Sequence, residues 1–125
     1  MLKNSIKQGD LGVADAILYF IENGVEVSIP FSESCPYDIL IDNGSSIDRV
    51  QVKTCNYKNP HGSYEVTLAT KGGNKSGQSI KTIDCTKVDF IFILTGNKDR
   101  YLIPAKQIHG KKTVTVGNDY CEYKL

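Results

Sequence analysis

The sequence predicts an α+β fold in which one N-terminal helix precedes a mixed or antiparallel sheet. Three observations indicate this fold. Apolar residues recur at helical spacing near the start of the chain, segments with strand-like alternation follow, and Gly, Asn and Pro separate these segments. The chain has 125 residues, which suits one core, and it contains no internal repeat. We therefore expect residues 1–125 to form a single domain.

Residues 5–23 are the predicted helix. Their apolar residues recur near helical spacing, and Asn23-Gly24 is a good C-terminal stop. Gly9 and Gly12 are unusual inside a helix, where each costs about 1 kcal/mol relative to Ala. Either the helix begins near Asp10, or the glycines permit close approach of another backbone or a ligand.

The first three strands are expected in the next part of the chain. Residues 25–30 alternate and end at a proline, which predicts a short strand. Residues 38–42 and 47–54 predict two strands of a hairpin, because Asn43-Gly44 between them tolerates positive φ. Side chains alternate along a strand, so Arg49, Gln51 and Lys53 share one face of the second strand.

The remaining elements are mostly strands. Residues 63–70 alternate cleanly, and residues 88–96 are nearly continuously apolar, as in a strand buried on both faces. Residues 100–104 return as the partner of that strand. Further along we expect one helical turn at 105–109, a short strand at 113–116, and a tail whose Tyr120 and Tyr123 pack on the sheet edge.

Residues 71–81 are the least strand-like segment. They hold three glycines and three lysines, and Ile80 is their only large apolar residue. We expect a mobile, exposed, basic loop. It is either a solvated linker or a flap whose glycines and lysines grip phosphate.

Overall composition and cysteine spacing narrow the functional classes. Hydrophobic residues make up 40% of the chain, charged residues 23%, and the net charge is +1, so DNA would have to be held by locally concentrated basic residues. The cysteines form no CxxC pair, which argues against zinc and favours reduced thiols. The segment MLKNSIKQGD is not a signal peptide, and no run approaches the ~20 apolar residues of a membrane span, so we expect a cytoplasmic protein. The cysteines are Cys35, Cys55, Cys85 and Cys121.

The predicted hairpin brings polar groups together. Asp38 opens its first strand, and Gln51 and Lys53 lie on the second. A carboxylate, an amide oxygen and an ammonium in one place can hold a divalent cation and stabilise charge on a phosphate. Each residue alone would more simply be a local hydrogen-bonding or exposed polar residue.

The combination PYDILID…RVQVKT resembles the PD-(D/E)xK nuclease motif. More narrowly, the chain is similar to the small intron-homing endonuclease branch, in which Gln occupies the second acidic position. The similarity extends to GDLGVADAILYFIENGVEVSIPF, GGNKSG and VDFIFILTG…RYLIPAKQI. It implies a restriction-endonuclease-like core, a central mixed sheet flanked by helices, and Mg²⁺-dependent cleavage of DNA phosphodiesters, with Mn²⁺ as a substitute.

The resemblance also implies roles for particular residues. Asp38 and Gln51 match the metal-binding positions, with the carbonyl of Val52 as a further ligand. Lys53 matches the motif lysine, which positions or deprotonates the attacking water. Val13 stands where relatives carry a helix Glu. Asp10, three residues earlier, shares a helix face with it. Asp15 points about 200° around the helix and is a poorer substitute.

The expected partner is DNA, bound by a homodimer or homotetramer, because a small chain offers little surface for a long site. A Holliday junction resolvase-like nuclease and a non-catalytic nucleic-acid-binding or interaction module that retains the nuclease fold remain alternatives. The candidate DNA-binding residues are Lys58, His61, Lys71, Asn74, Lys75 and Lys81.

Overall fold

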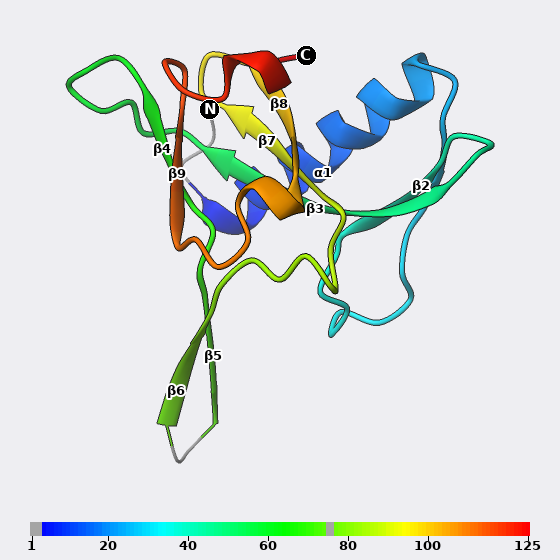
Figure 1. Cartoon of the computed structure of the whole chain (residues 1–125), viewed down its shortest axis with the longest axis horizontal. Coiled ribbons are helices and arrows are strands. Elements are labelled where there is room, and N and C mark those ends of the chain that lie inside the picture. Colours follow the sequence, from blue (N-terminus) through cyan, green and yellow to red (C-terminus); the bar gives the residue numbers. More distant parts are fainter. Residues whose placement is uncertain (1–3, 75–76) are drawn as a thin grey trace.

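The structure, a computed structural model, describes residues 4–74 and 77–125. A five-stranded sheet with the order β1-β2-β3-β7-β8 forms its centre, and the helix α1 (Ser5–Glu22) lies on one face of that sheet (Figure 1). The strands of this sheet are β1 (Glu26–Ser28), β2 (Ile39–Asp42), β3 (Ile47–Cys55), β7 (Phe90–Thr95) and β8 (Arg100–Pro104). Only the β3–β7 pair is parallel, so the sheet is mixed and the predicted α+β fold is confirmed.

Two small sheets and two short helical turns complete the described chain. The sheets are β4 (Tyr64–Thr67) with β9 (Thr113–Val116) and β5 (Thr70–Asn74) with β6 (Gly77–Lys81). The turns are η1 (Ala105–Gln107), where one helical turn was expected, and η2 (Cys121–Tyr123). The tail joins the edge strand β8, because Leu125 N donates to Arg100 O at 2.9 Å, as predicted. Within the described residues, no helix has both the length and the apolar character needed to cross a membrane.

Helix α1 includes both of its glycines, so the alternative start near Asp10 is wrong. Asn4 caps the helix, accepting at Oδ1 from Ile6 N at 2.9 Å. A Cβ on Gly12 would clash with Thr54 Cγ2 and would lie 3.1 Å from Val52 Cγ1. Gly12 therefore lets α1 approach β3 closely. A Cβ on Gly9 would meet nothing within 4 Å, so packing gives no reason for that glycine.

The central sheet separates two apolar cores. One lies beneath α1 and contains Phe20, Val50 and Phe92. The other lies on the opposite face, where β4, β9 and η1 cover the sheet. Side chains of β7 alternate between them, with Ile91 and Ile93 on one side and Phe92 and Leu94 on the other. This alternation confirms the prediction of a strand buried on both faces.

The expected loop at residues 71–81 is instead a two-stranded arm, so that prediction was wrong. β5 and β6 pair antiparallel from Thr70↔Lys81 to Asn74↔Gly77. Figure 1 shows the arm extending away from the rest of the molecule. Backbone hydrogen bonds can hold such a two-stranded ribbon without alternating apolar side chains. The glycines and lysines of this segment therefore gave no strand signal in the sequence.

Candidate active site

The side chains of β3 divide between the two faces of the sheet as the sequence predicts. Val52 and Thr54 lie against Gly12 of α1. Arg49 and Gln51 lie on the opposite face, where Arg49 bonds the segment before β7 and Gln51 lines a groove. The strand thus presents Arg49 and Gln51 on the face away from the helix.

Asp38 is held at the edge of β3 by two backbone hydrogen bonds. Its N–H donates to Val50 O at 2.9 Å, and its Oδ2 accepts from Val52 N at 2.7 Å. The β2–β3 ladder ends at Ile39↔Val50, so the Asp38 side chain occupies the place of a further strand residue. In a strand, the N–H and C=O of one residue point to the same side. The Val52 carbonyl therefore points toward the side where Asp38 lies.

Lys53 lies partly buried near this carboxylate. Burial lowers the pKa of its ammonium, because desolvation disfavours the charged form, and the negative charge of Asp38 partly offsets this effect. A lysine whose charge is poorly hydrated interacts more strongly with a nearby phosphate than an exposed one does.

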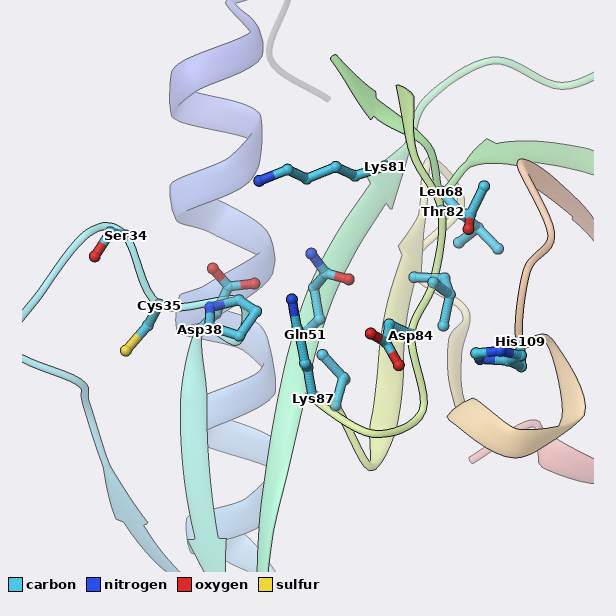
Figure 2. A pocket seen from close by; sticks show the side chains of 13 residues that line it. Ser34, Cys35, Asp38, Gln51, Leu68, Lys81, Thr82, Asp84, Lys87 and His109 are labelled. Carbon is cyan, nitrogen blue, oxygen red and sulfur yellow. The ribbon is translucent and has the colours of Figure 1, made fainter. Parts of the chain in front are cut away.

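A groove of ≈ 960 Å³ opens beside these residues. Asp38 and Gln51 line one side, and residues of the segment that joins β6 to β7 line the other (Figure 2). Lys81, at the end of β6, extends over the groove from the side of the arm. The structure thus brings Asp38, Gln51 and one of the predicted DNA-binding lysines to a single groove.

The other predicted DNA-binding residues are placed differently. Lys58 and His61 are exposed in the loop between β3 and β4, outside the set of residues that line the groove. Lys71 and Asn74 belong to the arm strand β5, and their side chains are not among those described. Lys75 lies outside the described residues.

Val13 and the two aspartates of α1 lie in different surroundings. Val13 packs against the apolar core beneath the helix, which suits valine and not a metal ligand. Asp10 is exposed. Asp15 binds the Arg100 guanidinium through both oxygens, at 2.8 and 2.7 Å, so its carboxylate is engaged in a structural ion pair.

Sequence reasoning missed the residues of the far wall of the groove. Asp84, Lys87 and His109 line it, and His109 Nδ1 accepts from Cys85 N at 3.1 Å. The connection from the arm to β7 brings Asp84 and Lys87 to this groove, and the segment after η1 brings His109, so no local pattern predicts their grouping. The one available signal was the position of Lys87 directly before the predicted buried strand, whose first paired residue, Phe90, lies beside Val50.

The donor atoms at this site suit a hard cation. The Asp38 carboxylate, the Gln51 amide oxygen and the Val52 carbonyl are oxygen ligands of the kind that Mg²⁺ prefers. In the part of the chain that the structure describes, no three His, Cys, Asp or Glu side chains gather into a metal-binding group. A cation here would thus rely on one carboxylate with neutral oxygens.

Comparison with known proteins agrees with this geometry. The chain is similar to a bacterial homing endonuclease, I-Ssp6803I, with a TM-score of 0.82 at 19% sequence identity; the match covers 97% of this chain and 88% of that chain. This likeness shows the shared fold. No curated protein matches the chain. A family model described as PD-(D/E)XK endonuclease matches residues 3–119, which confirms the resemblance seen in the sequence. The chain therefore belongs to the PD-(D/E)XK endonuclease family, and its function is that of a nuclease.

Proposed function

We propose that this nuclease hydrolyses DNA phosphodiester bonds in a reaction that depends on Mg²⁺, with Asp38, Gln51 and Lys53 as its catalytic residues. The observation that carries the proposal is the hydrogen bond from Val52 N to Asp38 Oδ2. It fixes a carboxylate at the open edge of β3, beside the groove that Gln51 lines.

Asp38, the Gln51 amide oxygen and the Val52 carbonyl would hold the cation, and Mn²⁺ would substitute for Mg²⁺. The cation would supply a lowered pKa for a bound water and electrophilic assistance at phosphate. The Val52 N–H orients the Asp38 carboxylate toward this task. Lys53 orients the attacking water and stabilises the negative charge that develops on the phosphate.

Asp10 is part of the proposal as an additional source of negative charge. Val13 occupies the position of the helix Glu, and Asp10 lies one turn earlier on the same helix face. Asp10→Asn is expected to raise several-fold the Mg²⁺ concentration that half-saturates cleavage. Glu22→Gln, an exposed change at the other end of α1, is the matched control and should leave that concentration unchanged.

The DNA would be held by the basic residues around the groove and the arm. Lys81 is supported by its place in the groove. The other expected DNA contacts are Lys58, His61, Lys71, Asn74 and Lys75. A homodimer or homotetramer would lengthen this contact surface. The apolar side chains of Leu18 and Ile21 are exposed on α1, 49% and 59% respectively, and offer a surface for a second copy.

The experiment is a cleavage assay with Mg²⁺ or Mn²⁺ on supercoiled plasmid, linear duplex and a four-way junction. Wild type should cleave, and Asp38→Ala and Lys53→Ala should abolish cleavage while both variants remain folded by circular dichroism. Cleavage that Asp38→Ala leaves unchanged would overturn the proposal. Cleavage of the junction but not of the duplexes would favour a Holliday junction resolvase-like activity.

The apolar packing of Val13 motivates one other candidate, a non-catalytic nucleic-acid-binding module that retains the nuclease fold. It predicts DNA retention that does not depend on divalent cations. Cleavage of any of the three DNA substrates that Lys53→Ala abolishes would exclude it.

A further inference from the structure

Lys87 faces Asp38 and Gln51 from the opposite wall of the groove. All three residues line the same ≈ 960 Å³ space. Figure 2 shows the Lys87 side chain directed toward the wall that carries Asp38 and Gln51. Nothing in the catalytic motif accounts for this lysine, which comes from the turn directly before β7.

The backbone that carries Lys87 is firmly held. Lys87 N and Val88 N both donate to Asp84 O, at 3.0 and 3.1 Å. The Asp84 carboxylate closes the same turn, because its Oδ1 accepts from Thr86 N at 2.9 Å and from Thr86 Oγ1 at 2.6 Å. Val88 is only 4% exposed and anchors the turn in the core. Lys87 therefore projects from a fixed base.

Arg49 ties this turn to the catalytic strand. Its Nη1 donates to Thr86 O at 2.9 Å, next to Lys87 in the chain. Arg49 lies two residues before Gln51, on the same face of β3. One guanidinium thus links the strand that positions Gln51 to the turn that positions Lys87, which keeps the two side chains in register across the groove.

The charges in the groove indicate which group the Lys87 ammonium would bind. Hydrogen bonds from Thr86 hold the pKa of the Asp84 carboxyl below the ordinary value, and the positive charge of nearby Lys87 adds a smaller effect in the same direction. A phosphodiester held beside Asp38 by a cation would bring further negative charge into the space in front of Lys87. An ammonium placed there adds most when charge builds up on the phosphate oxygens in the transition state.

We propose that Lys87 is a further catalytic residue of this nuclease. Its ammonium group binds a non-bridging oxygen of the DNA phosphate that is cleaved beside Asp38 and Gln51. This inference rests on the proposed function. Lys53 would then act from β3 and Lys87 from the opposite wall, so that the phosphate lies between two ammonium groups. The second positive charge compensates for a site in which Asp38 contributes one carboxylate and Gln51 a neutral amide.

The test compares Lys87→Met and Lys87→Arg with Lys98→Met. Lys98 is exposed beyond the other end of β7 and is not among the groove-lining residues, so it is the matched control. The probe is a random-sequence DNA duplex with Ca²⁺ in place of Mg²⁺, which keeps the duplex intact. The logarithm of the DNA-binding constant falls linearly with the logarithm of the salt concentration. Removing one phosphate contact should make this slope less steep by about 0.9. Lys87→Met should show that loss, and Lys87→Arg and Lys98→Met should keep the wild-type slope.

Single-turnover cleavage of supercoiled plasmid with Mg²⁺ is the second readout. Lys87→Met should slow it by on the order of 10²-fold, as removal of a transition-state donor does, and Lys98→Met should not slow it. If Lys87→Met matches Lys98→Met in both slope and rate, the inference is overturned. Failure of the proposed function itself looks different. Asp38→Ala would then cleave like wild type, while the salt slope would still report whether Lys87 contacts phosphate.

Discussion

Asp38 and Asp89 occupy equivalent places on the two sides of β3. Asp38 directly precedes β2, and Asp89 directly precedes β7. Each accepts a backbone N–H of β3 at 2.7 Å, Asp38 from Val52 and Asp89 from Arg49. Both aspartates therefore use one carboxylate oxygen to continue the ladder where strand pairing ends.

The two carboxylates differ in how their charge is compensated. Arg49 binds Asp89 through Nε at 3.0 Å and Nη2 at 3.1 Å, and this contact holds the pKa of Asp89 below its ordinary value. In the part of the chain that the structure describes, Asp38 forms no ion pair within 4 Å. The same backbone arrangement thus gives two different carboxylates. The charge of Asp89 is neutralised by Arg49, and the charge of Asp38 is available to a cation.

The largest expected effect concerns cleavage by Asp38→Asn and Asp89→Asn. Asn at position 38 keeps an oxygen for the Val52 N–H but removes the charge, so single-turnover cleavage should fall by at least on the order of 10²-fold. Asp89→Asn should reduce cleavage less than about tenfold. Its effect is indirect, because it loosens Arg49, which holds the turn that carries Lys87. Equal losses in the two variants would remove the distinction between the carboxylates.

Gly12→Ala tests the packing that supports the Asp38 side of β3. The added methyl would clash with Thr54 Cγ2, so we expect the free energy of unfolding to fall by about 1–3 kcal/mol in urea denaturation. A variant as stable as wild type would show that α1 can move away from Val52 and Thr54 without loss.

Asp89→Asn should lower the free energy of unfolding by about 1–2 kcal/mol at neutral pH, because it breaks a bidentate contact that is partly exposed. A carboxyl whose folded-state pKa is depressed stabilises the protein above its unfolded pKa, and this stabilisation is lost as pH falls through the folded value. The difference between wild type and Asp89→Asn should therefore vanish in acid. A difference that persists unchanged at low pH would contradict the assignment of Asp89 as a charged structural partner.

Gly9→Ala should have the smallest effect, a gain of about 0.4–1 kcal/mol in the free energy of unfolding, because its Cβ meets nothing and the unfolded chain loses freedom. Measured beside Gly12→Ala in the same helix, it separates helix propensity from close packing. Destabilisation by Gly9→Ala would contradict the assignment of Gly9 to an open position on the helix.

Much of the fold was predictable because its signals are local. The periodicity of α1, the Asn43-Gly44 turn and the continuous apolar run of β7 each identify an element directly. The hairpin predicted that Asp38 and Gln51 lie close together, and both line the groove, whereas Lys53 is not among its lining residues. Asp38 and Gln51 lie within a short stretch of chain, so their meeting depends on few long-range contacts.

What could not be predicted depends on contacts between distant segments. Asp38 and Asp89 look alike in the sequence, each standing before an apolar strand, and only the pairing of Arg49 with Asp89 across the parallel β3–β7 junction separates their roles. Lys87 reaches the groove through the same junction. The β5–β6 arm was missed because its backbone pairing needs no alternating side chains.

The most direct test of this account is calorimetric titration of Mn²⁺ into wild type, Asp38→Asn and Asp89→Asn. We expect saturable binding of Mn²⁺ to wild type and to Asp89→Asn, and loss of this binding in Asp38→Asn. Binding to Asp38→Asn as tight as to wild type would contradict the claim that Asp38 is the carboxylate that holds the cation.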